Sequence, residues 1–169
     1  MKTLVYNKDN LLNEDINSLS IRVKALIINK DKLIIGNEDG IYQFIGGHVE
    51  DNEDYISALK REIKEESGIE INNEEISGPF YKISYFNKDY PVLGTNKRND
   101  IYYYVVKTNK SVNLDNTSYT ENESNKHYKI LELDLNNSIF LIENNMSVNP
   151  DSEVISKDMI IVLKEYFDK

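Results

Sequence analysis

Three glutamates on one short stretch of the chain have the spacing of metal ligands. Glu62, Glu65 and Glu66 stand at i, i+3 and i+4, so on an α-helix their carboxylates are neighbours. Neighbouring like charges repel, and acids near the C-terminal end of a helix also oppose its dipole. A hard cation relieves both effects, and Mg²⁺ typically joins protein carboxylates to substrate phosphates. The glutamates therefore predict a metal site for phosphate chemistry, with a solvated acidic face as the alternative.

The residues around these glutamates predict a well-bounded helix from about Glu53 to Ser67. This segment contains no Pro or Gly, and its apolar residues recur at helical spacing on one face. Gly68 follows where a helix commonly ends. The pair Asp51 and Asn52 offers side-chain oxygens, and we expect the N-terminal cap there.

Two glycines, Gly46 and Gly47, lie between an apolar run at residues 41–45 and the acidic helix. Glycine lets the backbone approach a phosphate closely or adopt positive φ, and the carbonyls of such a loop can also reach a metal. A glycine pair alone usually indicates only a turn. Next to the acidic helix, the pair predicts a phosphate-facing loop that contributes to substrate binding.

The whole segment resembles the Nudix box, the motif of the Nudix hydrolase family. Residues 47–69, GHVEDNEDYISALKREIKEESGI, fill every defining position of that motif. Family members often carry Trp-x-x-Pro before the glycines, whereas this chain has Tyr42-Gln43-Phe44-Ile45, and Asn52 stands where a glycine is common. The resemblance covers 23 of 169 residues and implies an α/β fold, the Nudix-type α/β/α sandwich with a mixed β-sheet.

The resemblance also implies the metal ligands. In Nudix enzymes the second glutamate of the box and the following glutamate pair bind Mg²⁺, which implies Glu62, Glu65 and Glu66 here. A carbonyl of Gly46 or Gly47 is a further candidate ligand, and Mn²⁺ is the alternative ion. One of the glutamates can instead orient or deprotonate water.

The chain has only three arginines, and each is a candidate for the site. The resemblance implies that Arg61 and Glu53 form the pair that ties the helix to the loop, and the planar guanidinium suits a held carboxylate. Arg22, on an expected strand, and Arg98, on a loop before another, are candidate phosphate contacts. A surface position is the alternative for both.

The general base is predicted less directly. In the family it often comes from a loop downstream of the box, which here is TENESNKHYK. Glu123 is favoured over Glu121, as metal ligand or base, against the alternative of a solvated acidic loop. Glu65 and His127 are further candidates for the base.

Two functions from different classes follow. The leading interpretation is a Mg²⁺-dependent Nudix pyrophosphohydrolase that cleaves the diphosphate bond of a nucleoside diphosphate linked to another moiety, either a nucleoside triphosphate or a nucleotide conjugate. The alternative is a Nudix-like nucleotide-binding or sensor domain without useful turnover. The complete set of mutually repelling carboxylates favours the enzyme, because a site without chemistry has no reason to keep them.

Composition and net charge limit the classes of binding partner that we expect for this chain. The net charge of −9 and the absence of a basic patch argue against DNA binding and favour a small nucleotide substrate. No stretch predicts a signal peptide or a membrane span, so we expect a cytoplasmic protein. Residues 1–169 have the length of a single domain, and the size is compatible with a homodimer.

The pattern of the rest of the chain predicts alternating strands and helices. Strands are expected at 21–29, 32–36, 41–45, 79–86, 100–107 and 128–133. Helices are expected at 134–144 and, from apolar residues at helical spacing, at 154–167.

Overall fold

The computed structural model describes residues 1–119 and 127–168. Its strands are β1 Lys2–Tyr6, β2 Ser18–Asn29, β3 Lys32–Glu38, β4 Ile41–Gln43, β5 Ile76–Asn87, β6 Lys97–Lys107 and β7 Lys129–Asp134. Its α-helices are α1 Tyr55–Ser67, α3 Ser138–Val148 and α4 Glu153–Phe167. None of the described helices is long and apolar enough to cross a membrane.

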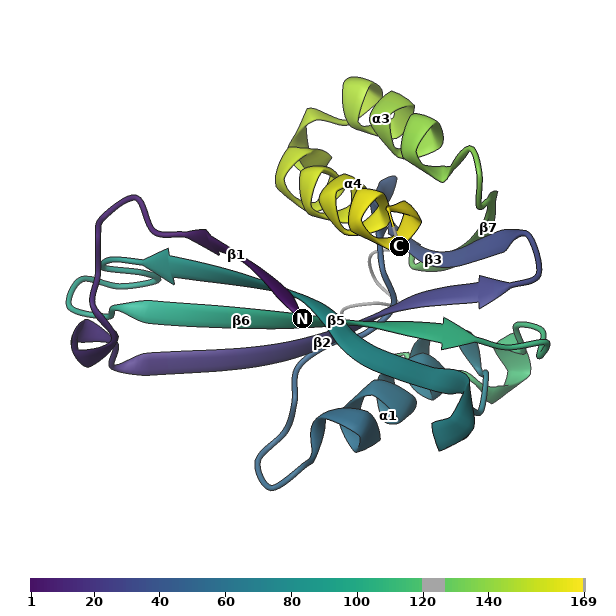
Figure 1. Cartoon of the computed structure of the whole chain (residues 1–169), viewed down its shortest axis with the longest axis horizontal. Helices are drawn as coiled ribbons and strands as arrows, with labels where there is room; N and C mark the ends of the chain where they lie inside the picture. Colours follow the sequence, from purple (N-terminus) through teal and green to yellow (C-terminus); the bar gives the residue numbers. More distant parts are fainter. Residues whose placement is uncertain (120–126, 169) are drawn as a thin grey trace.

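The described strands form one mixed sheet between two layers of helices, which confirms the expected α/β sandwich. The strand order is β1-β5-β6-β2-β3-β4, and β7 pairs with β3. β2 runs parallel to β6, whereas β3 runs antiparallel to both β2 and β7. Helix α1 covers one face of the sheet, and α3 and α4 cover the other (Figure 1).

The alternation of residues along β2 assigns its side chains to the two layers. Val23 and Ala25 belong to the apolar cluster under α1, whereas Leu26 belongs to the cluster under α4. Arg22 and Lys24 share the parity of Leu26, so their side chains leave the sheet on the α4 face.

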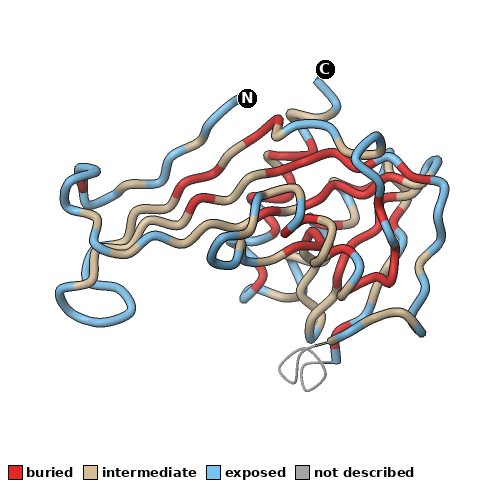
Figure 2. Tube along the Cα trace, turned by 90° about the horizontal axis from the view of Figure 1, so that it is seen from below, coloured by how far each residue is buried: buried red, intermediate tan, exposed pale blue. Residues whose placement is uncertain are grey.

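One end of the sheet extends beyond the helices as a projecting arm, built from β1, β5, β6 and the start of β2 (Figure 1). Buried residues are concentrated where the helices cover the sheet, and the tip of the arm is mostly intermediate or exposed (Figure 2). The helix-covered part therefore offers the rigid framework for a site.

Helix α1 is bounded by local contacts that differ from the prediction at one end. Asp54 caps the N-terminus through Oδ1, which accepts hydrogen bonds from two amides of the first turn, both at 3.0 Å. The expected cap at Asp51 and Asn52 is wrong because Asn52 adopts a φ of 65° and turns the chain again before the helix begins. Asparagine tolerates this left-handed conformation, which explains its presence where the family often has glycine. Gly68, with a φ of 69°, confirms the predicted C-terminus.

Two other elements differ from the prediction. Strand β1 pairs in parallel with β5 at the edge of the sheet, and its mostly exposed residues carry no alternating apolar pattern. The helix expected at 134–144 begins only at Ser138, because Asp134 ends β7 and its Oδ1 accepts the amide N–H of Asn137 at 3.0 Å in the intervening turn. The helix then continues to Val148.

Candidate active site

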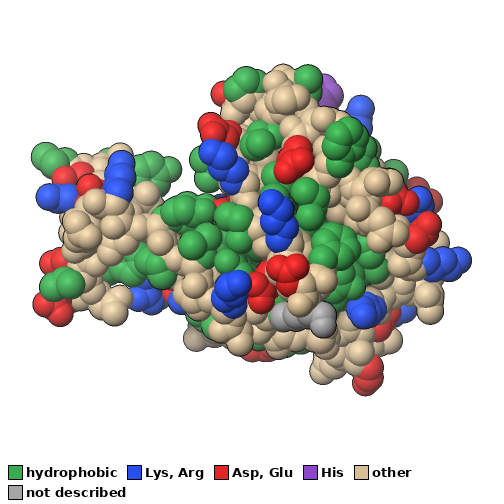
Figure 3. Space-filling model, turned by 45° about the horizontal axis from the view of Figure 1, so that its top comes forward, with side chains coloured by type: hydrophobic (Ala, Val, Ile, Leu, Met, Phe, Trp, Pro, Cys, Tyr) green, Lys and Arg blue, Asp and Glu red, His purple; other side chains and the backbone are tan. Residues whose placement is uncertain are grey.

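A hollow of about 450 Å³ opens between the glycine loop, the acidic side of α1 and the ends of several strands. On the face shown in Figure 3, acidic and basic side chains lie next to one another amid apolar ones. The residues that line the hollow are Arg22, Lys24, Glu38, Gln43, Gly46, Gly47, His48, Glu50, Arg61, Glu62, Glu65, Glu66, Ser118 and Tyr128. The fold thus brings most of the predicted site residues to one place.

Arg61 holds the surrounding carboxylates with its whole guanidinium group. Its Nε and Nη2 donate to the two oxygens of Glu53, at 3.0 and 2.9 Å, and Nη2 also donates to the His48 carbonyl at 3.0 Å. Its Nη1 donates to Glu62 Oε1 at 2.9 Å and to Glu65 Oε2 at 3.2 Å. Glu53 and, after it, Glu62 raise the pKa of Arg61 above its ordinary value, so the group stays charged. Arg61 itself therefore relieves part of the repulsion that the sequence analysis assigned to a metal.

Gly47 leaves the space that the Glu62 carboxylate occupies. A Cβ at Gly47 would stand 2.6 Å from both Cδ and Oε2 of Glu62, much closer than nonbonded atoms normally approach. Close approach is therefore the reason for glycine at this position. Gly46 differs, because its φ of 130° favours glycine and a Cβ there would collide with the Val23 carbonyl. Burial raises the pKa of Glu62, and the hydrogen bond from Arg61 opposes this effect.

Glu66 is a buried carboxylate, only 5 % exposed, and is held from two sides. Its Oε1 accepts the Gly46 amide N–H at 3.1 Å, and its Oε2 accepts the hydroxyl of Tyr128. Burial raises the pKa of Glu66 to about 7. Tyr128 reaches this position over Gly36, where a Cβ would collide with the tyrosine hydroxyl. A residue 62 positions away in sequence thus orients the last glutamate of the box.

Two cations from β2 face these carboxylates. Arg22 Nε donates to His48 Nε2 at 3.2 Å, and Lys24 Nζ donates to the Phe44 carbonyl at 2.9 Å. Burial lowers the pKa of both cations, and burial together with Arg22 lowers the pKa of His48. His48 therefore accepts as a neutral ring with its proton on Nδ1. Lys24 was not predicted as a site residue. The only sequence feature that pointed to it was its two-residue spacing from Arg22 in an apolar strand, which places both side chains on the same face of the sheet.

Other predicted residues lie apart from the hollow or outside the described part of the chain. Arg98 lies in the projecting arm, with its Nη2 3.4 Å from Asp100 Oδ2. The His127 side chain is 81 % exposed. Neither residue lines the hollow. Glu121 and Glu123 fall outside the described residues.

The donor chemistry of the hollow fits a hard cation. Glu62, Glu65 and Glu66 supply only oxygen donors, which are the ligands that Mg²⁺ prefers. Within residues 1–119 and 127–168, no three His, Cys, Asp or Glu side chains are already grouped closely enough to hold a metal ion. Arg61 contacts two of the glutamates and Tyr128 contacts the third, so cation binding requires these side chains to rearrange.

Comparison with known proteins identifies the class. The chain matches the model of the NUDIX domain over residues 19–140, well over half of its length, so it belongs to the Nudix family. It is thus a hydrolase that acts on pyrophosphate bonds. No curated protein matches the sequence significantly.

Several solved structures share the fold at low sequence identity. The E. coli dihydroneopterin triphosphate pyrophosphohydrolase is 17% identical, with a TM-score of 0.52 over 72% of this chain and 84% of that chain. A C. elegans Ap4A hydrolase binary complex is 16% identical, with a TM-score of 0.52 over 88% of this chain and 96% of that chain. The Bacillus halodurans MutT protein is 17% identical, with a TM-score of 0.52 over 72% of each chain. These likenesses concern the fold alone.

Proposed function

We propose that this chain hydrolyses the diphosphate bond of a nucleoside triphosphate or nucleotide conjugate in a Mg²⁺-dependent reaction, with Mn²⁺ as the alternative ion. The observation that supports this proposal is the arrangement around Arg61, whose guanidinium holds Glu53, Glu62 and Glu65 at one side of the hollow. Arg22 and Lys24 line the same hollow. A hollow with carboxylates beside cations suits a metal together with a phosphate chain.

Glu62, Glu65 and Glu66 would hold the metal, together with a carbonyl of the loop at Gly46 or Gly47. When bound, the ion neutralises charge on phosphoryl oxygens and lowers the pKa of a coordinated water. Arg22 and Lys24 bind the oxygens of the diphosphate from the opposite side.

The remaining groups position these residues or accept a proton. Arg61 and Glu53 are positioning residues, because their mutual bidentate pair fixes the helix against the loop. The Glu65 side chain is 39% exposed, compared with 13% for Glu62, so Glu65 is the better placed of the two to reach water. We therefore favour Glu65 as the general base. His48 is less suitable because its Nε2 already accepts a hydrogen bond from Arg22.

The test is a substrate screen with and without Mg²⁺. The panel contains nucleoside triphosphates, dinucleoside polyphosphates, ADP-ribose, nucleotide sugars and capped RNA, and the readout is released phosphate or pyrophosphate. We expect Mg²⁺-dependent turnover of at least one of these classes. Nucleotide binding without product from any class favours the alternative, a nucleotide-binding or sensor domain.

Paired variants then test the assignment of the helix. Glu62→Gln and Glu66→Gln are each expected to lower turnover of the best substrate about 100-fold, because each removes a carboxylate that would contact the metal. Glu70→Gln is the matched control, since this glutamate is 68 % exposed, pairs with Lys64 and lies outside the hollow. Unchanged turnover in Glu62→Gln and Glu66→Gln contradicts the assignment.

A further inference from the structure

A narrow slot of about 100 Å³ adjoins the hollow on the α4 face of the sheet. Arg22, Lys24 and Gln43 line both spaces, so the slot and the hollow are adjacent. The other walls of the slot are mainly apolar and come from β6, α4 and the loop after β4: Phe44, Ile101, Tyr103, Ile155 and Met159. An apolar slot next to two cations suits a molecule with a flat ring at one end and phosphate at the other.

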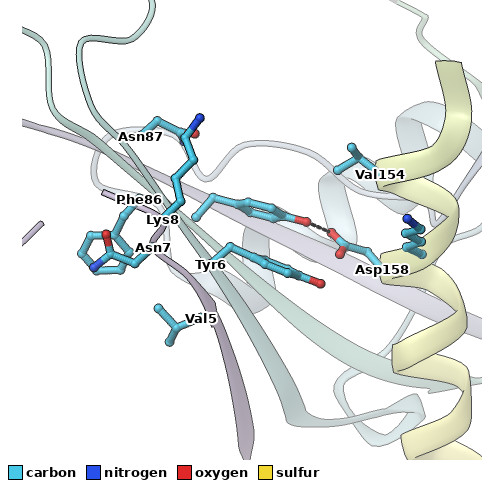
Figure 4. Close-up of a pocket in the computed structure, with 10 residues that line it drawn as sticks. Val5, Tyr6, Asn7, Lys8, Phe86, Asn87, Val154 and Asp158 are labelled. Atoms are coloured by element: carbon cyan, nitrogen blue, oxygen red, sulfur yellow. Dashed lines mark hydrogen bonds between the residues drawn. The ribbon is translucent and has the colours of Figure 1, made fainter. Parts of the chain in front are cut away.

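The one acidic residue that lines this slot is Asp158 of α4, which is only 7 % exposed. The Tyr85 hydroxyl donates to its Oδ2 at 2.6 Å. Figure 4 shows Asp158 reaching from α4 toward the aromatic side chains of the sheet, with this hydrogen bond dashed. Asp158 also lines a wider cleft of about 720 Å³ on its other side, next to Tyr6 and Lys157.

The second oxygen of this carboxylate has no partner among the described residues. Asp158 Oδ1 is buried from solvent and accepts no hydrogen bond from the part of the chain that the structure describes. Leaving a buried acceptor unpaired is unfavourable, and more so for a charged group. Tyr85 needs only one acceptor, which an asparagine would also supply, so the second oxygen has no structural role in that contact. An unpaired buried acceptor beside a slot indicates an N–H donor on a ligand.

We propose that the slot receives the base of the nucleotide substrate and that Asp158 Oδ1 accepts a hydrogen bond from an exocyclic amino group on the edge of that base. The proposal rests on the proposed function, since the phosphate chain of the same substrate extends past Arg22 and Lys24 to the carboxylates. It specifies a base that carries an amino group, such as adenine, guanine or cytosine. Phe44 and Tyr103 supply aromatic walls for the ring. Because Oδ1 is buried, base binding requires side chains of the slot to move, and one of them, Ile155, is 39% exposed.

The test compares a substrate with an analogue that lacks the exocyclic amino group of the base. Purine riboside replaces adenosine in an adenine nucleotide, and inosine, which lacks the 2-amino group, replaces guanosine in a guanine nucleotide. For the wild type we expect kcat/KM to fall roughly 10- to 100-fold with the analogue, the loss typical of one hydrogen bond to a charged group. Asp158→Ala should lose this discrimination, so that the two substrates are turned over with similar kcat/KM. The effect should lie mainly in KM, because Asp158 does not line the hollow that holds the carboxylates.

Binding measurements separate this proposal from the proposed function. Calorimetric titration with the nucleoside monophosphate pair, in the absence of metal, reports base preference without turnover. Glu153→Gln is the matched control, because it removes an exposed carboxylate from the same helix without touching the slot. If no substrate is turned over but the wild type still prefers the amino base and Asp158→Ala does not, the proposed function fails and the base site stands.

The proposal is overturned if the wild type binds and turns over both members of the pair equally. It is also overturned if Asp158→Ala retains the wild-type preference. Asp158→Asn is a second variant that preserves side-chain volume and an acceptor for Tyr85, and it keeps the test valid if the alanine variant fails to fold. Its amide must offer either an oxygen or an NH₂ group to the slot, so it should reduce the preference for the amino base.

Discussion

Replacing Gly47 with alanine tests whether this glycine controls the position of the Glu62 carboxylate. The new Cβ would lie 2.6 Å from Cδ and Oε2 of Glu62 and closer still to Oε1, whereas ordinary contact begins near 3.4 Å, so the carboxylate must retreat by at least about 0.8 Å. Because the carboxylate is the end of a flexible side chain, we expect the free energy of unfolding to change by less than about 1 kcal/mol. A misplacement of about 1 Å costs roughly 100-fold in rate. We therefore expect kcat/KM to fall about 100-fold, equivalent to about 2.7 kcal/mol.

The assay combines steady-state kinetics on the best substrate with urea unfolding of the same preparation. Gly94→Ala is the control for a glycine with no atom near its added Cβ; its φ of 84° makes alanine strained, so some stability is lost, but kcat/KM should be unchanged. Gly46→Ala is the opposite control, because its φ of 130° and a collision with the Val23 carbonyl should destabilise the fold strongly. Wild-type kcat/KM in Gly47→Ala would refute the reasoning. A loss of stability equal to that of Gly46→Ala would also refute it, because the backbone would then be what requires glycine.

Three further predictions concern groups around the hollow and the slot. Arg61→Lys removes the planar guanidinium group that orients the glutamates. In steady-state assays kcat should therefore fall about 100-fold with little change in KM, and an unchanged kcat contradicts a positioning role. Tyr128→Phe removes the hydroxyl that donates to Glu66, so the free energy of unfolding measured in urea should fall by about 1–3 kcal/mol. A variant as stable as the wild type contradicts a stabilising role for this hydrogen bond. Burial raises the pKa of Asp158 from its ordinary 3.8 to about 6, so between these two pH values the folded state binds the proton more strongly than the unfolded state. Relative to Asp158→Asn, the wild type should therefore lose up to about 3 kcal/mol of stability as the pH rises from 4 to 6, with no such loss at lower pH. The measurement is urea unfolding of both proteins at several pH values. A difference in free energy of unfolding that stays constant across this range contradicts the prediction.

Features that depend on neighbouring residues were predictable from the sequence. Gly68 ends α1 as expected, because its left-handed φ is a local property of the helix end. The N-terminal cap was misplaced by two to three residues, since Asp54 and Asp51 carry the same side chain and only the turn at Asn52 selects between them. Strand β1 was not predicted, because an edge strand with mostly exposed residues takes its conformation from pairing with β5.

The family, the acidic helix and the carboxylates on it could all be predicted from the amino-acid sequence. These features were accessible because the box spans only 23 residues and helical geometry relates Arg61 to Glu62 and Glu65 without further information. The identity of the distant residues that join them follows only from the three-dimensional fold. Pairing of β3 with β7 brings Tyr128 to Glu66, and packing of α4 against the sheet brings Asp158 to the slot. Such contacts depend on the register of strands and on helix packing between segments far apart in the chain, which local spacing does not encode.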